Sequence, residues 1–296
     1  MSALVRRLII IALGALAGLA AWPLAELVLT FQADFPSYLT FTACLGAAVG
    51  LPMGAFFASG EGITSTVRAK LGTGLLVGAS LGLAGGIVGA LAGQAALLFS
   101  GEILMRSYRS FQRVGLPLAR SLGWACLGLF VGMSEGVRAA SGRKILVGLL
   151  GGLLGGLLGG AALEYARLLL PRPLAARLAG LVILGLAIAV CYAAIERGFS
   201  DGVLRLLNGK QKGKEFPINQ NRIRIGRSRR CEITLTAYEQ LADRQVEIRV
   251  RRGEATIINL DKSHPLLVND RPVTEQRLKF GDVVKIGSAK LFYKAA

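Results

Sequence analysis

The chain has 296 residues, of which 53% are hydrophobic and 18% are charged, and its mean hydropathy is +0.53. This composition excludes an ordinary soluble globular protein and a disordered chain. The formal net charge of +17 is unevenly spread: residues 1–200 hold 15 Lys and Arg and 7 Asp and Glu, whereas residues 201–296 hold 20 and 11. The sequence therefore predicts a membrane domain at 1–197 and a soluble domain at 201–296.

Apolar runs of about 18 or more residues are candidate transmembrane helices. We expect six of them, at about residues 8–30, 38–58, 71–99, 116–134, 145–170 and 178–195. The first run follows Arg6 and Arg7, as in a signal peptide, but its apolar stretch continues to Thr30, which favours a retained helix. The fourth run contains Arg120 and is followed by Glu135, so we expect one or both of them near a membrane interface.

The second and third runs resemble the fourth and fifth at an offset of 74 residues. Glu61 matches Glu135, and Lys70 matches Lys144. The glycines that match are Gly54, Gly74, Gly78, Gly82, Gly85 and Gly86 with Gly128, Gly148, Gly152, Gly156, Gly159 and Gly160. The pattern indicates the internal duplication of a helical hairpin.

Glycines recur every fourth residue in the third and fifth runs, as in Gly148, Gly152 and Gly156. Such ridges lack side chains and let a neighbouring helix approach closely in lipid. We favour tight packing within one bundle. A homo-oligomer, or a pore lined by backbone, is the alternative.

Four acidic residues lie in or at the ends of the apolar runs, namely Glu26, Glu61, Glu135 and Glu164. A channel or transporter would use such residues to bind protons or cations. We favour positions at the interface, with Glu61 and Glu135 contacting Arg68 or Arg138, because no polar stripe crosses the runs. In the connector at 103–114, the arginines share one helical face, which is typical of an amphipathic helix on the bilayer surface.

The reactive side chains are too few for the common catalytic sites. Cys44, Cys126, Cys191 and Cys231 form no disulfide framework, and we expect them to be small buried residues. His264 is the single histidine, which argues against a His-based metal site or catalytic triad. The sequence therefore predicts neither an enzyme nor a bound cofactor or metal.

From about Asp201 the hydrophobic pattern has a period of two, with turn residues between short runs. The runs lie at 204–206, 222–225, 246–250, 255–258, 266–268, 283–286 and 291–293. Turns are expected at Asn208-Gly209, Asn269-Asp270 and Gly281-Asp282. This pattern predicts an all-β sandwich after the α-helical membrane bundle.

The soluble part also carries an ordered set of motifs. They are Ile225-Gly226-Arg227-Ser228, Cys231-Glu232-Ile233, Val246-Glu247-Ile248, Ile258-Asn259-Leu260-Asp261, Leu267-Val268-Asn269, and Leu278 followed by Gly281-Asp282-Val283-Val284 and Ile286-Gly287. In order and spacing they resemble a forkhead-associated (FHA) domain over residues 203–294. FHA domains are β-sandwiches whose loops at one end bind phosphothreonine peptides.

The resemblance implies a phosphopeptide-binding site. Arg227 stands at the position of the arginine that pairs with the phosphate, a role that suits a planar guanidinium. Ser228, Arg229, Ser263 and Asn269 are the supporting loop residues that we expect.

The sequence departs from the family pattern at this site. The family's Ser-x-x-His falls on Ala242 and Gln245, and its Thr/Ser-Asn-Gly turn falls on Ser263, His264 and Pro265. A hydrogen bond to a charged group contributes about 1.5–3 kcal/mol, so losing two weakens binding by roughly two to four decades. Three further arginines in these loops either compensate or form a solvated basic surface, namely Arg229, Arg230 and Arg244.

These observations predict a membrane-anchored scaffold for signalling, whose FHA-like domain binds a protein partner with or without phosphothreonine. The alternative is a channel or transporter regulated by that domain. The basic charge favours anionic membrane lipid over nucleic acid as a further partner, because no exposed aromatic residues alternate along the strands. By resemblance, the domain is expected on the cytoplasmic side of the cell membrane.

Overall fold

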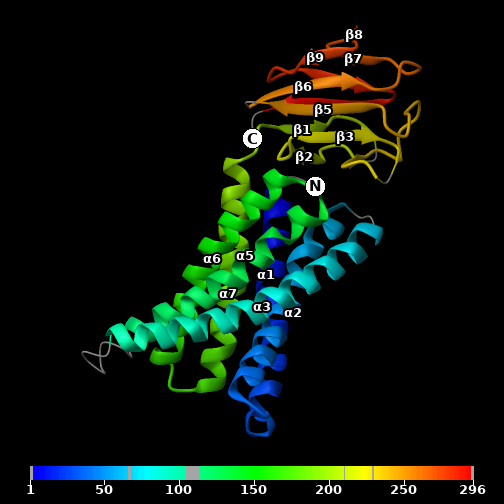
Figure 1. Cartoon of the computed structure of the whole chain (residues 1–296). Helices are drawn as coiled ribbons and strands as arrows, with labels where there is room; N and C mark the ends of the chain where they lie inside the picture. Colours follow the sequence, from blue (N-terminus) through cyan, green and yellow to red (C-terminus); the bar gives the residue numbers. More distant parts are fainter. Residues whose placement is uncertain are drawn as a thin grey trace. The chain divides into compact units, whose positions relative to one another are not determined.

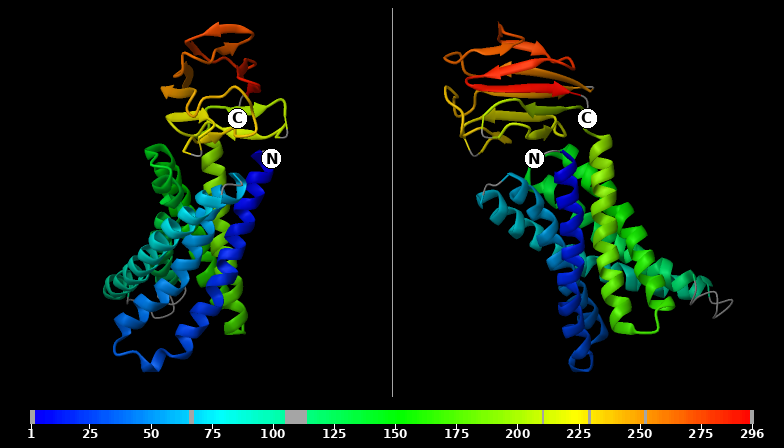
Figure 2. Two further views of the ribbon diagram at one scale, coloured as in Figure 1. Left: turned by 90° about the vertical axis from the view of Figure 1, so that its right-hand side faces the viewer. Right: turned by 180° about the vertical axis from the view of Figure 1, so that it is seen from behind.

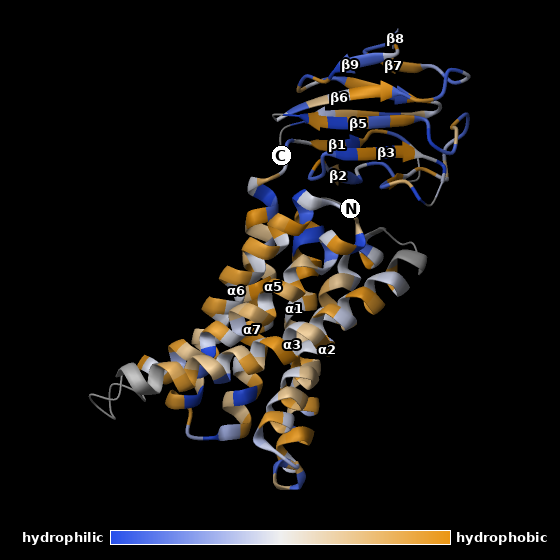
Figure 3. Ribbon diagram, viewed as in Figure 1, coloured by the Kyte–Doolittle hydropathy of each residue, from blue (hydrophilic) through white to orange (hydrophobic). Residues whose placement is uncertain are grey.

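The structure is a computed structural model that describes residues 3–65, 68–104, 114–209, 211–228, 230–251 and 253–294. Its N-terminal part contains long helices and its C-terminal part contains short strands (Figure 1). Contacts divide the chain into two units, one formed by residues 7–196 and one that contains residues 197–296. Apolar residues run along the full length of the helices, whereas polar residues are concentrated in the strand-rich unit (Figure 3).

Six helices of the described chain are long and apolar enough to cross a membrane. They are α1 (Ala3–Thr30), α2 (Tyr38–Ser65), α3 (Arg68–Leu104), α5 (Leu116–Arg138), α6 (Gly142–Leu169) and α7 (Pro173–Gly198), with a short 3₁₀ helix η1 (Gln32–Asp34) after α1. The predicted six-helix bundle is confirmed. The helices extend beyond the apolar runs: α2 continues past Ala58 and α5 past Ser134, each through a glutamate. Most of the connector that we predicted to be amphipathic lies outside the described residues.

Helix α6 shows how the sequence sets a helix boundary. Ser141 is its N-cap, with an extended backbone and a hydroxyl oxygen that accepts a hydrogen bond from the N–H of Lys144. Such a cap satisfies one of the N–H groups that have no partner within the helix. Glycines then fill the buried face of the helix, including Gly148, Gly152 and Gly156.

The glycine ridges form the helix contacts within this unit. A Cβ atom on Gly54 would overlap the carbonyl oxygen of Gly78, so α2 and α3 approach at the distance of backbone contact. Similar contacts, which we call glycine seams because two helix backbones touch at a glycine, join α6 to α7 at Gly155 and α1 to α7 at Gly14. Figure 2 shows α1 alongside α7. In lipid, where no hydrophobic effect drives helices together, such close backbone packing provides the attraction.

The internal repeat appears in the contacts themselves. Gly54 meets Gly78 across α2 and α3, and 74 residues later Gly128 meets Gly152 across α5 and α6. The same offset relates the pair Ala58 and Gly74 to the pair Gly132 and Gly148, and the pair Gly62 and Leu71 to the pair Gly136 and Ile145. The two hairpins are therefore built on one packing pattern.

The C-terminal unit is a sandwich of two β-sheets. Its strands are β1 (Val203–Leu206), β2 (Glu215–Pro217), β3 (Arg222–Gly226), β4 (Ile233–Thr234), β5 (Val246–Arg251), β6 (Glu254–Asn259), β7 (Leu266–Val268), β8 (Arg271–Val273), β9 (Glu275–Arg277), β10 (Val283–Ile286) and β11 (Ala289–Lys294). One sheet has the order β2-β1-β11-β10-β7-β8 and the other β4-β3-β5-β6-β9. All seven predicted runs are strands, and the predicted β-sandwich is confirmed.

The core of the sandwich lies between the sheets. Leu204 and Leu291 from one sheet and Ile225, Ile248 and Ile257 from the other are fully buried members of one cluster. Alternation along each strand places these residues inward, as the period of two predicts. The expected turns are present, because Gly209, Asn269, Asp270 and Gly281 all have positive φ angles. Of the cysteines, Cys231 is buried and Cys44 is exposed, contrary to the expectation that all four are buried.

Candidate functional site

Three loops of the sandwich lie at one end of the second sheet. In the antiparallel register, Ile225 at the end of β3 pairs with Val246 at the start of β5, and Val246 pairs with Asn259 at the end of β6. The loop after β3, the loop before β5 and the loop after β6 therefore emerge at the same edge. These are the loops in which the resemblance places the phosphopeptide site.

Arg227 lies on the first of these loops. Its N–H donates to the carbonyl oxygen of Ala242 at 3.0 Å, and the N–H of Ser228 donates to that of Asp243 at 3.1 Å. A Cβ on Gly226 would overlap the Asp243 carbonyl, so glycine permits this close approach. The backbone of the loop is thereby held, while the Arg227 side chain is exposed and makes no ion pair with any described residue. A fixed loop with an exposed guanidinium is suited to binding an anion.

Two of the supporting residues, Ser228 and Ser263, lie at the same end of the fold as Arg227. The hydroxyl of Ser228 accepts a hydrogen bond from the N–H of Arg230 at 3.3 Å, and Ser263 lies exposed in the loop after β6. Both lie in loops at the same end as Arg227. Arg229 lies outside the described residues.

Asn269 lies elsewhere. It follows β7, which begins at the loop end and runs away from it, so Asn269 is at the opposite end of the sandwich. Its side-chain amide donates to Asp282 at 2.9 Å and its oxygen accepts from the N–H of Val283 at 2.9 Å. These bonds hold the β7–β8 turn against the start of β10. The structure therefore does not bring Asn269 together with Arg227.

Gln245 occupies the interior of the loop end. Its side chain is fully buried, and its Oε1 accepts a hydrogen bond from the N–H of Ala242 at 3.4 Å. Its Nε2 has no hydrogen-bond partner among the described residues. The glutamine thus braces the loop from inside, at the position where the FHA pattern has histidine, while Ala242 offers no hydroxyl to a ligand.

The loop after β6 closes on itself through Asp261. The carboxylate of Asp261 accepts a hydrogen bond from the N–H of Ser263 at 2.9 Å and lies 2.7 Å from Nδ1 of His264. These contacts hold the pKa of the Asp261 carboxyl below its ordinary value, the N–H of Ser263 contributing most and His264 next. Asn259 donates to the carbonyl oxygen of His264 at 3.0 Å and anchors the loop to β6. The ionised carboxylate of Asp261 therefore repels the phosphate or carboxylate group of a ligand that approaches this loop.

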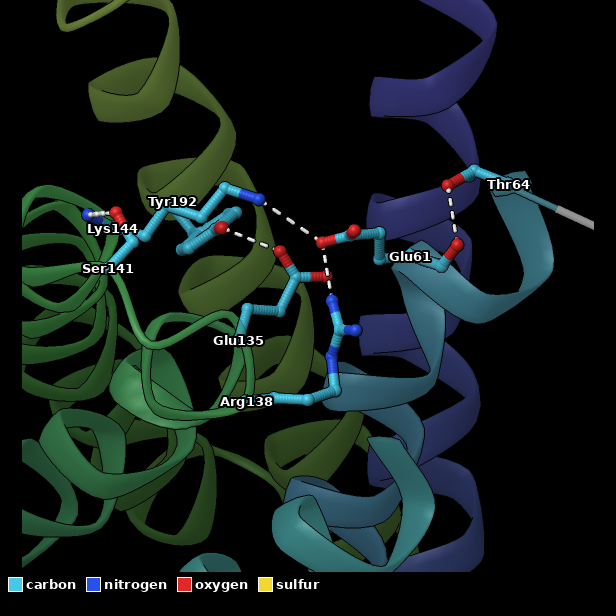
Figure 4. A network of polar contacts seen from close by, with 7 residues as sticks. All are labelled: Glu61, Thr64, Glu135, Arg138, Ser141, Lys144 and Tyr192. Carbon is cyan, nitrogen blue, oxygen red and sulfur yellow. Dashed lines mark hydrogen bonds and ion pairs between the residues drawn. The ribbon is translucent and has the colours of Figure 1, made fainter. Parts of the chain in front are cut away.

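The membrane unit contains a polar cluster where the repeats meet (Figure 4). Glu61 of α2 forms ion pairs with Arg138 of α5 and with Lys144 of α6, the latter at 3.1 Å. The arginine contact confirms the favoured prediction that Glu61 contacts Arg138 at a helix end. The lysine contact was not foreseen, although Glu61 and Lys144 both belong to the repeated set.

Glu135, the repeat counterpart of Glu61, is only 1% exposed. It accepts a hydrogen bond from the hydroxyl of Tyr192 on α7 at 2.8 Å. The ring of Tyr192 packs edge-on against Phe57 of α2, with ring centroids 5.2 Å apart. The cluster thus joins α2, α5, α6 and α7.

The other acidic residues also pair within the bundle. Glu26 of α1 accepts two hydrogen bonds from Arg177 of α7, at 2.5 and 2.7 Å. Glu164 of α6 is contacted by Arg120 and Arg167, and by the indole N–H of Trp124 at 3.1 Å. These partners were not predicted: Arg177, Arg120 and Trp124 come from other helices, whereas Arg167 lies three residues after Glu164 on α6.

The family that matches this chain covers its C-terminal unit. Residues 205–296 match the family described as "Inner membrane component of T3SS, cytoplasmic domain", where T3SS denotes the type III secretion system. The matched region begins within β1 and contains the whole loop end. The C-terminal third is an FHA-like domain. It follows six apolar helices, so the chain is a multi-pass membrane protein that carries an FHA-like domain, as the sequence predicted.

Solved structures similar to this domain include FHA domains and a secretion-system protein. The FhaA FHA domain, crystallised with the intracellular domain of Rv3910, is 26% identical with a TM-score of 0.29, over 31% of this chain and 99% of that chain. The FHA domain of CT664 from Chlamydia trachomatis is 17% identical with a TM-score of 0.30, over 32% and 97%. The cytoplasmic domain of the T3SS sorting platform protein PscD from P. aeruginosa is 14% identical with a TM-score of 0.30, over 32% and 79%. No curated protein matches the chain.

Proposed function

We propose that the protein is a membrane-anchored scaffold whose FHA-like domain binds a protein partner through the loop end that carries Arg227. The observation that carries the proposal is the exposed Arg227 guanidinium on a loop held by backbone hydrogen bonds. Such a group pairs with a phosphate or a carboxylate on a partner. Ser228 and Ser263, in loops at the same end, supply hydroxyl groups.

Phosphothreonine recognition by this loop end is expected to be weak. Ala242 lacks the hydroxyl of the FHA pattern, and the ionised Asp261 carboxylate lies in the adjoining loop. We therefore propose that phosphate strengthens binding without being required for it. An acidic segment of a folded partner then serves as the main ligand.

The matched family supports a role in a membrane assembly and a location on the cytoplasmic side, since its description names a cytoplasmic domain of an inner-membrane component. A scaffold of this kind acts by binding rather than by catalysis. Anchoring by six helices keeps the domain at the bilayer surface, where anionic lipid is a second ligand for its basic residues.

The alternative of a channel or transporter needs Glu61 and Glu135 to face water. In the structure Glu61 is paired with two cations and Glu135 is buried against Tyr192. Both carboxylates are therefore occupied by side chains of neighbouring helices. The geometry thus favours the scaffold.

The test is binding of the full-length protein, in lipid nanodiscs, to a phosphothreonine peptide library and to the matched unphosphorylated library. The Arg227→Ala variant is expected to lose about tenfold or more in affinity for any peptide bound. Arg271→Ala is the matched control, because Arg271 is an exposed arginine of β8 at the opposite end of the sandwich. Equal loss in both variants, or no binding to either library by the wild type, would contradict binding through the loop end.

A further inference from the structure

The membrane unit contains a cavity of about 150 Å³ among its helices. Most of its lining is apolar or glycine, including Val49, Gly89 and Leu127. Three arginines and one carboxylate also line it: Arg120, Arg167, Arg177 and Glu164. Neither Glu61 nor Glu135 is among the lining residues, so this cavity is distinct from the polar cluster of Figure 4.

The charged residues of the cavity form a layer near one set of helix ends. Arg120 lies four residues after the start of α5, Arg177 four residues after the start of α7, and Glu164 five residues before the end of α6. At 1.5 Å per residue these positions are about 6–8 Å inside the helix ends. Because successive helices alternate in direction, all three lie on the membrane side opposite to the end of α7. This depth corresponds to the level of lipid headgroups.

The apolar part of the cavity reaches deeper. Val49 lies eleven residues after the start of α2, and Leu127 eleven residues after the start of α5. These positions are about 16 Å from the same helix ends. Half of a bilayer's hydrocarbon core is about 15 Å thick. The cavity therefore extends from the headgroup level to about 8–10 Å below it, which is more than half of this thickness, along the direction taken by a lipid chain in one leaflet.

The charges at the headgroup level do not cancel. Arg120 and Arg167 share the single carboxylate of Glu164, at 3.1 and 3.4 Å, and that carboxylate is only 2% exposed. Arg177 is neutralised by Glu26. One positive charge thus remains among these five side chains. The side chains of Arg120 and Arg167 are 37% and 33% exposed, so their remaining N–H groups are accessible to an anion.

The geometry points to a site for one anionic phospholipid. Its singly charged phosphodiester binds between Arg120 and Arg167, and one acyl chain enters the apolar cavity. Charge complementarity selects an anionic headgroup over a zwitterionic one, because the excess charge of the site is a single positive unit. The buried Glu164 carboxylate, itself held by the indole N–H of Trp124, fixes the two guanidinium groups in place.

Arg167→Gln is the informative substitution. It removes the excess charge but leaves Glu164 paired with Arg120, so no buried carboxylate loses its last cation. Arg172→Gln is the matched control, because Arg172 is exposed in the short connection between α6 and α7 and does not line the cavity. Gly93→Leu provides an independent test: a Cβ there meets its nearest atom, the Cα of Gly123, at 3.4 Å, and the substitution adds apolar volume at a lining position without changing any charge.

The measurement is native mass spectrometry of the full-length protein in detergent with phosphatidylglycerol, phosphatidylcholine or oleate. We expect one phosphatidylglycerol per chain, bound about tenfold or more tightly than phosphatidylcholine. Arg167→Gln should abolish that preference, Gly93→Leu should weaken the binding of phosphatidylglycerol, and Arg172→Gln should keep both. The proposal is overturned by equal binding of the two phospholipids, by a loss in Arg172→Gln as large as in Arg167→Gln, by unchanged binding in Gly93→Leu, or by binding of oleate in place of phospholipid.

Discussion

Single side chains determine what the loop end of the FHA-like domain can bind. Arg227 keeps the anion-binding group of the family pattern, whereas Gln245 converts the position of a histidine into an internal brace. Asp261 and His264 use the third loop for a hydrogen-bonded turn rather than for an asparagine that holds a peptide. The chemistry of this end is therefore that of exposed cations, Arg227 among them, in loops that also carry an ionised carboxylate.

The turn at Asp261 predicts a pH dependence in acid. A lowered pKa means that the folded loop favours the carboxylate, so the turn is stabilised above the ordinary pKa of about 3.8 and loses that stabilisation as the pH falls through the lowered pKa. NMR of the full chain with ¹³C-labelled aspartate should place the Asp261 midpoint below that ordinary value. His264→Ala should raise the midpoint only part of the way, because the N–H of Ser263 remains. A wild-type midpoint at or above the ordinary value would show that the turn does not form in solution.

Pairs of helices are held by glycine seams whose geometry leaves no space for a methyl group. The carbonyl oxygens of Gly78 and Gly152 lie where the Cβ atoms of Gly54 and Gly128 would be. Because the seam is backbone against backbone, it loses almost no side-chain entropy on packing. Its weakness is that substitution by any larger residue forces the helices apart.

Gly54→Ala is expected to destabilise the bundle by about 1–3 kcal/mol, since the added methyl overpacks the seam. Gly72→Ala is the matched control in α3, because a Cβ there meets nothing within 4 Å. The control should be neutral or slightly stabilising, as alanine favours helix more than glycine does. Thermal unfolding of the detergent-solubilised full chain measures both. Equal melting temperatures for the two variants would show that the close contact at Gly54 does not stabilise the bundle.

Much of this arrangement was predictable from the sequence, for identifiable reasons. Length and hydropathy predicted the helices, and the period of two predicted the strands that carry buried Ile and Val. The short strands β2, β4, β8 and β9 were missed because two or three residues show no periodicity. Motif order also does not reveal that Asn269 follows the end of β7 that points away from the loops near Arg227. Lys144 as a partner of Glu61, and Arg120 and Trp124 as partners of Glu164, come from other helices, and spacing along one chain does not disclose such contacts.

Six crossings place both ends of the membrane unit on one side of the bilayer. The connection η1 and the connection between α6 and α7 are then on the other side. The FHA-like domain follows α7 directly, so it belongs to the side of the N-terminus. The positively charged residues do not determine this arrangement, because with six crossings eight Lys and Arg of residues 1–197 fall on one side and seven on the other.

Cysteine labelling checks this topology. In a variant without native cysteines, Gln32→Cys on η1 should react with an impermeant thiol reagent added to intact cells, and Lys262→Cys in the loop after β6 should react only in inverted vesicles. Both residues are exposed, so a difference in labelling reports the side of the membrane and not burial. Labelling of both positions from the same side would exclude six crossings with this topology.

Tandem duplication of a two-helix hairpin determines how the two copies are oriented in the membrane. A unit of two helices returns to the side from which it started, so copying it in tandem preserves the direction of every crossing. The copies are therefore parallel repeats, unlike the inverted repeats on which many transporters base alternating access. Equivalent residues then end at the same depth and on the same face, which is how Glu61 of the first copy can meet Lys144 of the second. The ion pair thus joins the acidic position of one copy to the lysine position of the other.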